Sequence, residues 1–156
     1  MARLTNGDKA PEFKLFDQHN NQVTLNDYRG SKVLLYFYPR ANTPGCTVQS
    51  KAVSEAREEL AQLNCQVIGI SPDKPEKQLK FDTKHELGFP LLADTEYKVA
   101  ESYGAWGEKK LYGKTFLGII RSAFLIDENG IIIESWYKVK PKDTVPNVLK
   151  ILAPNN

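Results

Sequence analysis

The segment from Val33 to Val48, VLLYFYPRANTPGCTV, constrains the fold of this chain more than any other. Its first six residues form a continuous apolar run, which is typical of a strand in the interior of a sheet. Pro39 cannot donate a ladder hydrogen bond, so the predicted strand ends there. Thr43 followed by Pro44 is a helix-start signal, with threonine as the N-cap and proline in the first helical position. The segment therefore predicts a buried strand, a short loop and a helix.

Cys46 falls in the first turn of this predicted helix. Unpaired backbone N–H groups and the positive end of the helix dipole favour an anion in that turn. A free thiol has a pKa of about 8.5, and lowering a thiol pKa to about 6 takes roughly 3 kcal/mol. Because a helix end supplies about 2 kcal/mol at most, a cation has to add the rest, and Arg40 and Arg121 are the candidates. The alternative is that Cys46 is a small buried apolar residue, as most free cysteines are.

Strand-like and helix-like segments alternate along the rest of the chain. Apolar runs and turn signals predict strands over 66–71, 89–93, 122–126 and 131–137, after a short N-terminal hairpin that ends at 22–24. Helical spacing and start signals predict helices over 43–63, 74–86, 97–103 and 145–152. Residues 104–118 contain four glycines and are expected to form a long loop. This order predicts an α/β fold of three layers, as a single domain over 1–156.

Composition makes several kinds of partner and site improbable. The chain has 21 basic and 19 acidic side chains, and a formal charge of +2 is too balanced to indicate nucleic acid or a membrane surface. No apolar run reaches the roughly 20 residues that span a bilayer, and the N-terminal residues do not resemble a signal peptide. We therefore expect a cytoplasmic protein. Neither Cys46 and Cys65 nor His19 and His85 have the spacing of a metal site, so we expect no metal and no cofactor.

Several strings of this sequence resemble one protein family. Pro39, Thr43 and Cys46 spell P-x-x-x-T-x-x-C, the active-site signature of peroxiredoxins. The strings FYPRANTPGCTVQ, GISPDKPE and YGAWGEKKLYGKTFLGIIRSAFLIDENG resemble the bacterioferritin comigratory protein branch, also called peroxiredoxin Q. The resemblance extends from about Gly7 to Leu152. It implies a thioredoxin-like fold with an N-terminal β-hairpin extension and a central mixed sheet flanked by helices. It also implies a thiol-dependent peroxidase that reduces hydrogen peroxide and organic hydroperoxides in antioxidant defence.

The resemblance assigns a role to each candidate catalytic residue. Cys46 corresponds to the peroxidatic cysteine, whose thiolate attacks the terminal peroxide oxygen and becomes a sulfenic acid. Thr43 corresponds to a hydrogen-bonding hydroxyl, Pro39 to a residue that shields the pocket from water, and Arg121 to a donor toward the thiolate and the peroxide. Without the resemblance, Thr43 is a plain N-cap, Pro39 a strand stop and Arg121 a surface arginine. Gln49 is a candidate support for Arg121.

The glycine-rich segment 104–118 also matches the branch, through Trp106, Lys109, Tyr112 and Lys114. Two interpretations of these four side chains stay open. They pack as part of a loop against the sheet, or they contact the substrate.

Position 51 departs from the branch, many of whose members carry a resolving cysteine there. Lys51 removes the commonest intramolecular disulfide. Cys65 lies near the far end of the helix that begins beside Cys46, so the two thiols are expected to be about 25 Å apart at 1.5 Å per residue. A disulfide needs Cα atoms within about 7 Å. We therefore expect a one-cysteine peroxiredoxin, a monomer or weak dimer, reduced by an external thiol such as thioredoxin, glutaredoxin or glutathione. Cys65 is expected to be a buried structural residue.

Two other functions stay open at this point. A thioredoxin-type disulfide oxidoreductase needs C-x-x-C, and the equivalent stretch here is Thr43-Pro44-Gly45-Cys46, with one cysteine missing. A non-catalytic chaperone or binding protein would keep the fold without the chemistry. A Cys46→Ser variant separates these functions, because a chaperone survives the change and a peroxidase does not.

Overall fold

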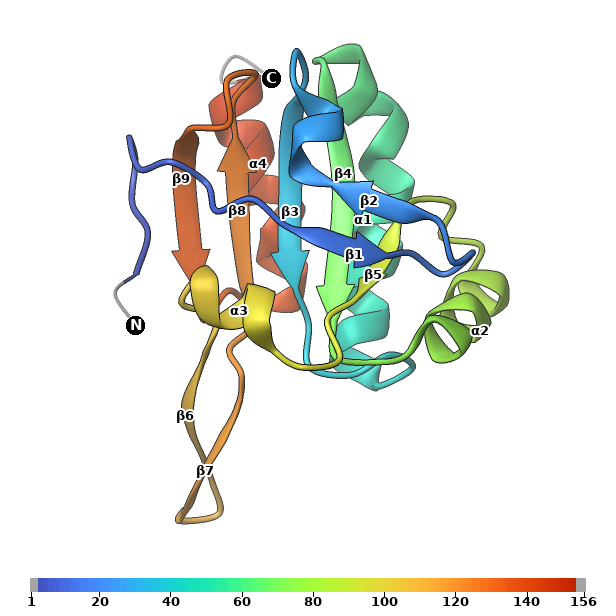
Figure 1. The fold of residues 1–156 in the computed structure, drawn as a ribbon, viewed down its shortest axis with the longest axis vertical. Helices are drawn as coiled ribbons and strands as arrows, with labels where there is room; N and C mark the ends of the chain where they lie inside the picture. The colour runs from blue at the N-terminus through green and yellow to red at the C-terminus, as the bar shows by residue number, and fades with distance from the viewer. Residues whose placement is uncertain (1–2, 154–156) are drawn as a thin grey trace.

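A seven-stranded mixed sheet forms the centre of the molecule in a computed structural model, which describes residues 3–153 (Figure 1). The strand order is β2-β1-β5-β4-β3-β8-β9. The strands of this sheet are β1 (Lys14–Phe16), β2 (Gln22–Thr24), β3 (Lys32–Phe37), β4 (Cys65–Ser71), β5 (Leu91–Ala93), β8 (Ser122–Ile126) and β9 (Ile132–Tyr137). The α-helices are α1 (Pro44–Gln62), α2 (Pro75–His85), α3 (Lys98–Ser102) and α4 (Thr144–Leu152), with short 3-10 turns at Leu25–Tyr28 and Pro141–Asp143.

Strand directions bring three chain segments to one edge of this sheet. β3 runs parallel to β4, and β4 runs parallel to β5. β8 lies antiparallel to β3, with Phe37 opposite Ser122. The carboxyl end of β3 and the beginning of β8 therefore meet at the same edge, where α1 also begins (Figure 1).

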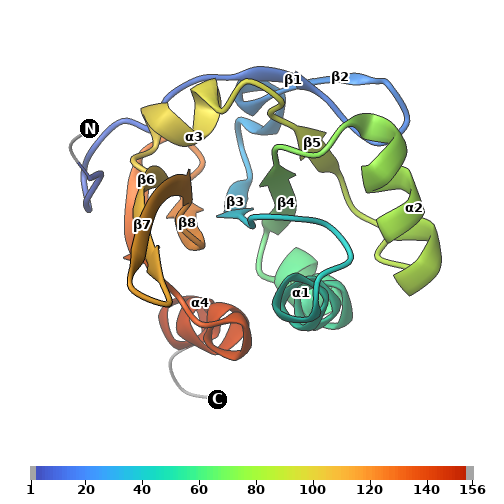
Figure 2. The ribbon, with the colours of Figure 1, turned by 90° about the horizontal axis from the view of Figure 1, so that it is seen from below.

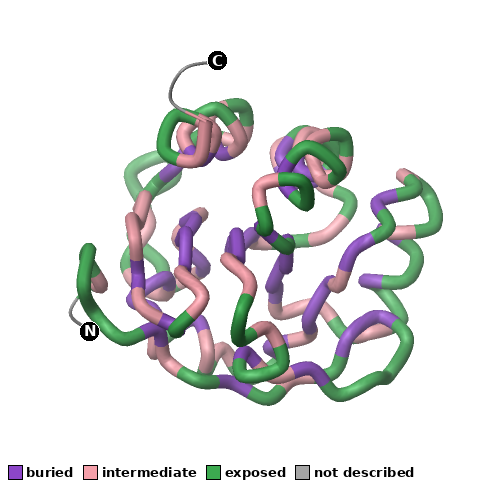
Figure 3. Tube along the Cα trace, turned by 90° about the horizontal axis from the view of Figure 1, so that it is seen from above, coloured by how far each residue is buried: buried purple, intermediate pink, exposed green. Residues whose placement is uncertain are grey.

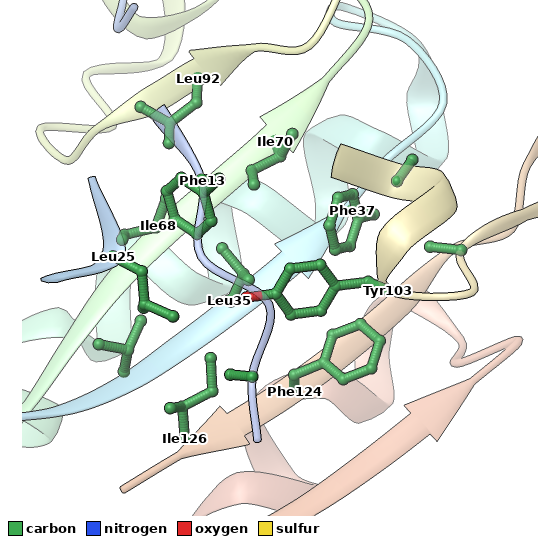
Figure 4. Close-up of a cluster of buried hydrophobic side chains, with 14 of the residues drawn as sticks. Phe13, Leu25, Leu35, Phe37, Ile68, Ile70, Leu92, Tyr103, Phe124 and Ile126 are labelled. Atoms are coloured by element: carbon green, nitrogen blue, oxygen red, sulfur yellow. The ribbon is translucent and has the colours of Figure 1, made fainter. Parts of the chain in front are cut away.

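The sheet separates two hydrophobic cores. β3 is buried on both faces, and its side chains alternate between them, with Leu35 and Phe37 in one core and Leu34 and Tyr36 in the other. The first core contains an aromatic cluster in which the ring centroid of Phe37 lies 5.4 Å from that of Tyr103 (Figure 4). Purple, buried segments concentrate in the central strands (Figure 3). The continuous apolar run of β3 thus reflects burial on both sides.

Helices cover both faces of the sheet. α1 and α4 lie on one face and α3 lies on the other, and the β1–β2 end of the sheet curls toward the side of α3 (Figure 2). α2 packs on the face of α1, since its Phe81 shares a core with Val53 and Leu60 of α1. The expected layers, mixed sheet and N-terminal hairpin are confirmed. Within residues 3–153, no helix combines the length and apolarity required to cross a membrane.

The expectation of a long loop over 104–118 is wrong. This segment is a second, separate two-stranded sheet, formed by β6 (Trp106–Leu111) and β7 (Lys114–Ile119). Tyr112 and Gly113 form its turn, both with positive φ (52° and 78°), as type I′ hairpin turns require. The hairpin extends away from the main sheet (Figure 1), and most of its residues are exposed. Because little of it is buried, its sequence lacks the apolar alternation that identifies a strand.

Candidate active site

The sulfur of Cys46 and the guanidinium of Arg121 meet at the sheet edge where α1 begins. Cys46 lies in the first turn of α1 and is fully buried. Arg121 directly precedes β8, and its Nη2 donates to the sulfur of Cys46 over 3.4 Å. The structure therefore brings together two predicted site residues from distant parts of the chain. Arg40, the other cation considered, has an exposed side chain.

Two buried side chains hold the guanidinium in place. The Nη1 of Arg121 donates to the Oε1 of Gln49 over 2.6 Å, and the Nε2 of Gln49 donates to the Oγ1 of Thr144 over 2.9 Å. Gln49 and Thr144 are both fully buried. The predicted support by Gln49 is present as a hydrogen bond. Thr144 was not predicted, because a threonine at the start of a distant helix carries no local sequence signal.

Gly45 allows this close approach of Arg121 to the helix. A Cβ atom on Gly45 would lie 3.1 Å from the Nη2 of Arg121 and 3.6 Å from the Cγ of Pro141. A contact of 3.1 Å is tighter than nine in ten real Cβ contacts, so with a side chain here the guanidinium would have to shift by a few tenths of an ångström. Steric limits beside Arg121 therefore explain why position 45, in the T-P-G-C string, is a glycine.

Thr43 is the N-cap residue of α1, as predicted, but its side chain makes no capping hydrogen bond. Its Oγ1 donates instead to the backbone carbonyl of Arg40 over 2.7 Å, inside the loop between β3 and α1. The N–H groups of the first helical turn are therefore not occupied by the Thr43 hydroxyl, and the hydroxyl oxygen retains lone pairs for a further donor. The loop is also tied to the end of β4, because the N–H of Ala41 donates to Asp73 over 2.7 Å.

Tyr36 is buried in the same hydrophobic core as Cys46. Its hydroxyl lies 2.8 Å from the Oγ of Ser50, a buried residue of α1. Burial raises the pKa of Tyr36, a nearby charge on Cys46 would raise it further, and Ser50 and Arg121 oppose this increase. The phenol therefore stays protonated at neutral pH and contributes no negative charge to the site.

A surface depression of about 660 Å³ opens beside Arg121. Pro39, half-buried after the end of β3, and Ile120 supply apolar lining. Lys109 and its neighbours Glu108 and Lys110 on β6 also line it. Cys46 is fully buried and does not line the depression; Arg121 connects the two, because it lines the depression and contacts the sulfur.

Cys65 lies at the opposite end of the central strands from Cys46. It is the first residue of β4 and is opposite Lys32, the first residue of β3, whereas Cys46 follows the other end of β3. Burial, the largest effect, raises the pKa of its thiol to about 11. Both cysteines are free. Cys65 is thus a buried, protonated thiol far from Arg121, as expected.

Comparisons with known proteins agree with this arrangement. The sequence matches the AhpC/TSA family over residues 6–135. It is 47% identical over 146 residues to peroxiredoxin Bcp of Bacillus subtilis, covering 94% of this chain and 93% of that protein. It is 50% identical over 132 residues to peroxiredoxin Bcp of Escherichia coli K12, covering 85% of each.

Solved structures give the same result. The chain is similar to the bacterioferritin comigratory protein of Xanthomonas campestris, with a TM-score of 0.85, 30% identity, and coverage of 91% of this chain and 90% of that one. It is similar to PrxQ of Xylella fastidiosa, with a TM-score of 0.91, 29% identity, and coverage of 99% and 98%. The expected thioredoxin-like fold is confirmed.

Proposed function

The chain belongs to the AhpC/TSA family, in the bacterioferritin comigratory protein or peroxiredoxin Q branch of the peroxiredoxins, and from this premise we propose a one-cysteine cycle at Cys46. As a peroxiredoxin it is a thiol-dependent peroxidase, consistent with a role in antioxidant defence. The observation that carries the proposal is the 3.4 Å contact between Arg121 and the buried sulfur of Cys46. A helix end alone stabilises a thiolate too weakly for this chemistry. The contact places beside the sulfur the cation that adds the remaining stabilisation.

In the first half of the cycle, the Cys46 thiolate attacks the terminal oxygen of the hydroperoxide. A sulfur–oxygen bond forms and the oxygen–oxygen bond breaks, which oxidises the sulfur to a sulfenic acid and reduces the peroxide. The leaving oxygen takes a proton from water and departs as an alcohol, or as water when hydrogen peroxide is the substrate. Arg121 stabilises the negative charge on the sulfur and on the reacting oxygens.

We assign supporting roles to Thr43 and Pro39. The Thr43 hydroxyl donates to the Arg40 carbonyl, so its oxygen is oriented to accept a hydrogen bond from the incoming peroxide. Pro39 presents an apolar ring in the depression beside Arg121, where it limits the access of water to the charged pair. A drier site strengthens the electrostatic interaction between thiolate and guanidinium.

In the second half of the cycle, an external thiol attacks the sulfenic sulfur of Cys46 and releases water. A second thiol then resolves the mixed disulfide and restores Cys46. Because Cys46 is fully buried, a protein reductant reaches it only when the first turn of α1 opens. Thioredoxin, glutaredoxin and glutathione are the proposed reductants, and a monomer or weak dimer is the proposed state. A reducing compartment such as the cytoplasm fits two free thiols.

The position of Cys65 supports a cycle that does not use it. It begins β4 beyond the far end of α1, which extends over Pro44–Gln62. At 1.5 Å per residue this helix separates the two thiols by roughly 25 Å, against about 7 Å between Cα atoms in a disulfide. Bridging them would require unfolding most of α1.

The test is intact-protein mass spectrometry after one equivalent of hydrogen peroxide, with and without dimedone. The expected result is a dimedone adduct on Cys46 and no loss of two hydrogens. A rapid loss of two hydrogens that maps to a Cys46–Cys65 disulfide would overturn the one-cysteine cycle. The Cys46→Ser variant is the control, since it must lose both the adduct and peroxidase turnover.

A further inference from the structure

The hairpin β6–β7 leads directly into the candidate active site. Trp106 pairs with Ile119 at the base of the hairpin, and the N–H of Ile120 donates to the carbonyl of Ala105 over 2.7 Å. Arg121 is the next residue. The hairpin therefore has a fixed attachment beside the guanidinium that contacts Cys46.

Lys109 of β6 is directed toward this attachment. Its backbone pairs with Phe116 across the hairpin. Its aliphatic chain, however, packs over Gly118, because a Cβ atom at that position would lie 3.1 Å from the Cδ of Lys109. Gly118 is closer to the base of the hairpin than Phe116. The side chain of Lys109 is half-buried and lines the same depression as Pro39 and Arg121. Within residues 3–153, no carboxylate forms a salt bridge with it.

The charges around Lys109 are those of the active site. Burial lowers the pKa of Lys109, the charge of Arg121 lowers it further, and Cys46 acts in the opposite direction. Glu108 and Lys110 flank it on β6, and Lys138 lines the same depression. Lys109 is thus a partly desolvated cation within electrostatic reach of both Arg121 and Cys46.

The reaction moves negative charge outward, from the sulfur to the leaving oxygen. Arg121 contacts the sulfur and so stabilises the thiolate before the reaction begins. A cation placed further out gains interaction energy only as the leaving oxygen becomes negative, and such differential binding is what accelerates a chemical step. Lys109 is half-buried and lines the depression together with Arg121, whereas the fully buried Cys46 does not line it, so the lysine is the more outward of the two.

Building on the peroxidase cycle above, we propose that Lys109 is a further catalytic residue, whose ammonium group contacts the leaving oxygen of the hydroperoxide and stabilises its negative charge. The oxygen–oxygen bond breaks as the sulfur–oxygen bond forms, and the leaving oxygen then takes its proton from water. Because Gly118 has no side chain, the aliphatic chain of Lys109 can pass over it toward the site.

The test compares peroxides whose leaving groups differ in basicity. For Lys109→Gln, the second-order rate constant for oxidation of Cys46 should fall about tenfold with hydrogen peroxide and tert-butyl hydroperoxide. It should fall less than about threefold with peracetic acid, because acetate leaves without needing a cation. Lys109→Arg keeps the charge and should remain within about threefold of the wild type for all three peroxides. Lys114→Gln, on the same hairpin but outside the depression, is the matched charge control.

Equal slowing of Lys109→Gln with all three peroxides would show a structural effect or an effect on the thiolate, and would overturn the proposal. An unchanged rate with hydrogen peroxide would overturn it too. The urea midpoint of each variant shows whether the fold is intact. If the wild-type protein forms no sulfenic acid with any peroxide, the peroxidase cycle fails instead, which separates the two conclusions.

Discussion

At the scale of single residues, the reactivity of Cys46 depends on how firmly Arg121 is held. Arg121 uses one terminal nitrogen on the sulfur and the other on Gln49, so both of its nearest partners are on α1. Thr144 completes the chain from α4. A cation fixed in this way needs little reorganisation when the peroxide reacts, which is the main advantage of a preorganised site.

The Arg121→Ala variant should therefore react with hydrogen peroxide at least about tenfold more slowly than the wild type, since removal of one preorganised donor typically has a larger effect still. Stopped-flow measurement of the second-order rate constant checks this prediction. Arg121→Lys retains a charge without the fork that contacts Cys46 and Gln49 together, and it should recover only part of the loss. An unchanged rate in Arg121→Ala would remove Arg121 from the mechanism.

Gln49→Ala should have a smaller effect of the same origin. It leaves the charge of Arg121 in place but removes its anchor, so a loss of about three- to tenfold in the same rate constant is expected. The double variant Gln49→Ala/Arg121→Ala should be no slower than Arg121→Ala alone, because the anchor acts only through the guanidinium. Additive losses in this cycle would show that Gln49 has a separate role.

At the scale of elements, the sequence predicts best where burial imposes a pattern. The strand expected over 33–38 is Lys32–Phe37, and the helix expected over 43–63 is Pro44–Gln62. The hairpin β6–β7 was not predicted, because its two strands pair only with each other and leave most side chains in solvent. The proximity of Arg121 and Cys46 was expected from the family resemblance and not from spacing, since no local pattern links residues so far apart in sequence.

The first turn of α1 gives an element-scale prediction for position 51. Cys46 is buried and Lys51 is exposed, so the two side chains lie on different faces of α1. Five residues rise about 7.5 Å along a helix, which is beyond the Cα separation of a disulfide. A disulfide between these positions therefore requires the first turn to unwind, as reduction of a buried sulfenic acid by a protein partner also does.

The Lys51→Cys variant should convert to an intramolecular disulfide after one equivalent of hydrogen peroxide, with a loss of two hydrogens by mass spectrometry. The wild type and a Lys51→Ser control should keep a dimedone-reactive sulfenic acid under the same conditions. A stable sulfenic acid in Lys51→Cys would mean that the first turn of α1 does not open, and the proposed route for a protein reductant would fail with it.

At the scale of the whole molecule, the sheet separates two thiols with different roles. Cys46 lies at the edge that carries Arg121, whereas Cys65 lies at the opposite edge, in the core beneath α1. The buried environment raises the pKa of Cys65 well above that of a free thiol, to about 11. A protonated thiol is a poor nucleophile, so Cys65 should resist oxidation while the protein is folded.

The same shift makes the stability of the protein depend on pH in the alkaline range. In the unfolded chain Cys65 loses its proton near pH 9.0, while in the folded protein it keeps that proton up to about pH 11. Unfolding therefore releases a proton between these values, and the free energy of unfolding falls as the pH rises from about 9 to about 11. The loss reaches about 2 kcal/mol at pH 11, and the full two pKa units correspond to roughly 3 kcal/mol above that pH.

Urea unfolding under reducing conditions at pH 8, 9, 10 and 11 measures this loss. Burial also raises the pKa values of Tyr36 and Tyr103, and these tyrosines steepen the alkaline decline in every variant. Cys65→Ala isolates the thiol, because the tyrosine contributions cancel when it is compared with the wild type. The variant should be less stable at pH 8, through lost packing, and the difference should shrink by about 2 kcal/mol by pH 11. Parallel stability curves would show instead that the Cys65 thiol ionises equally in the folded and unfolded chains.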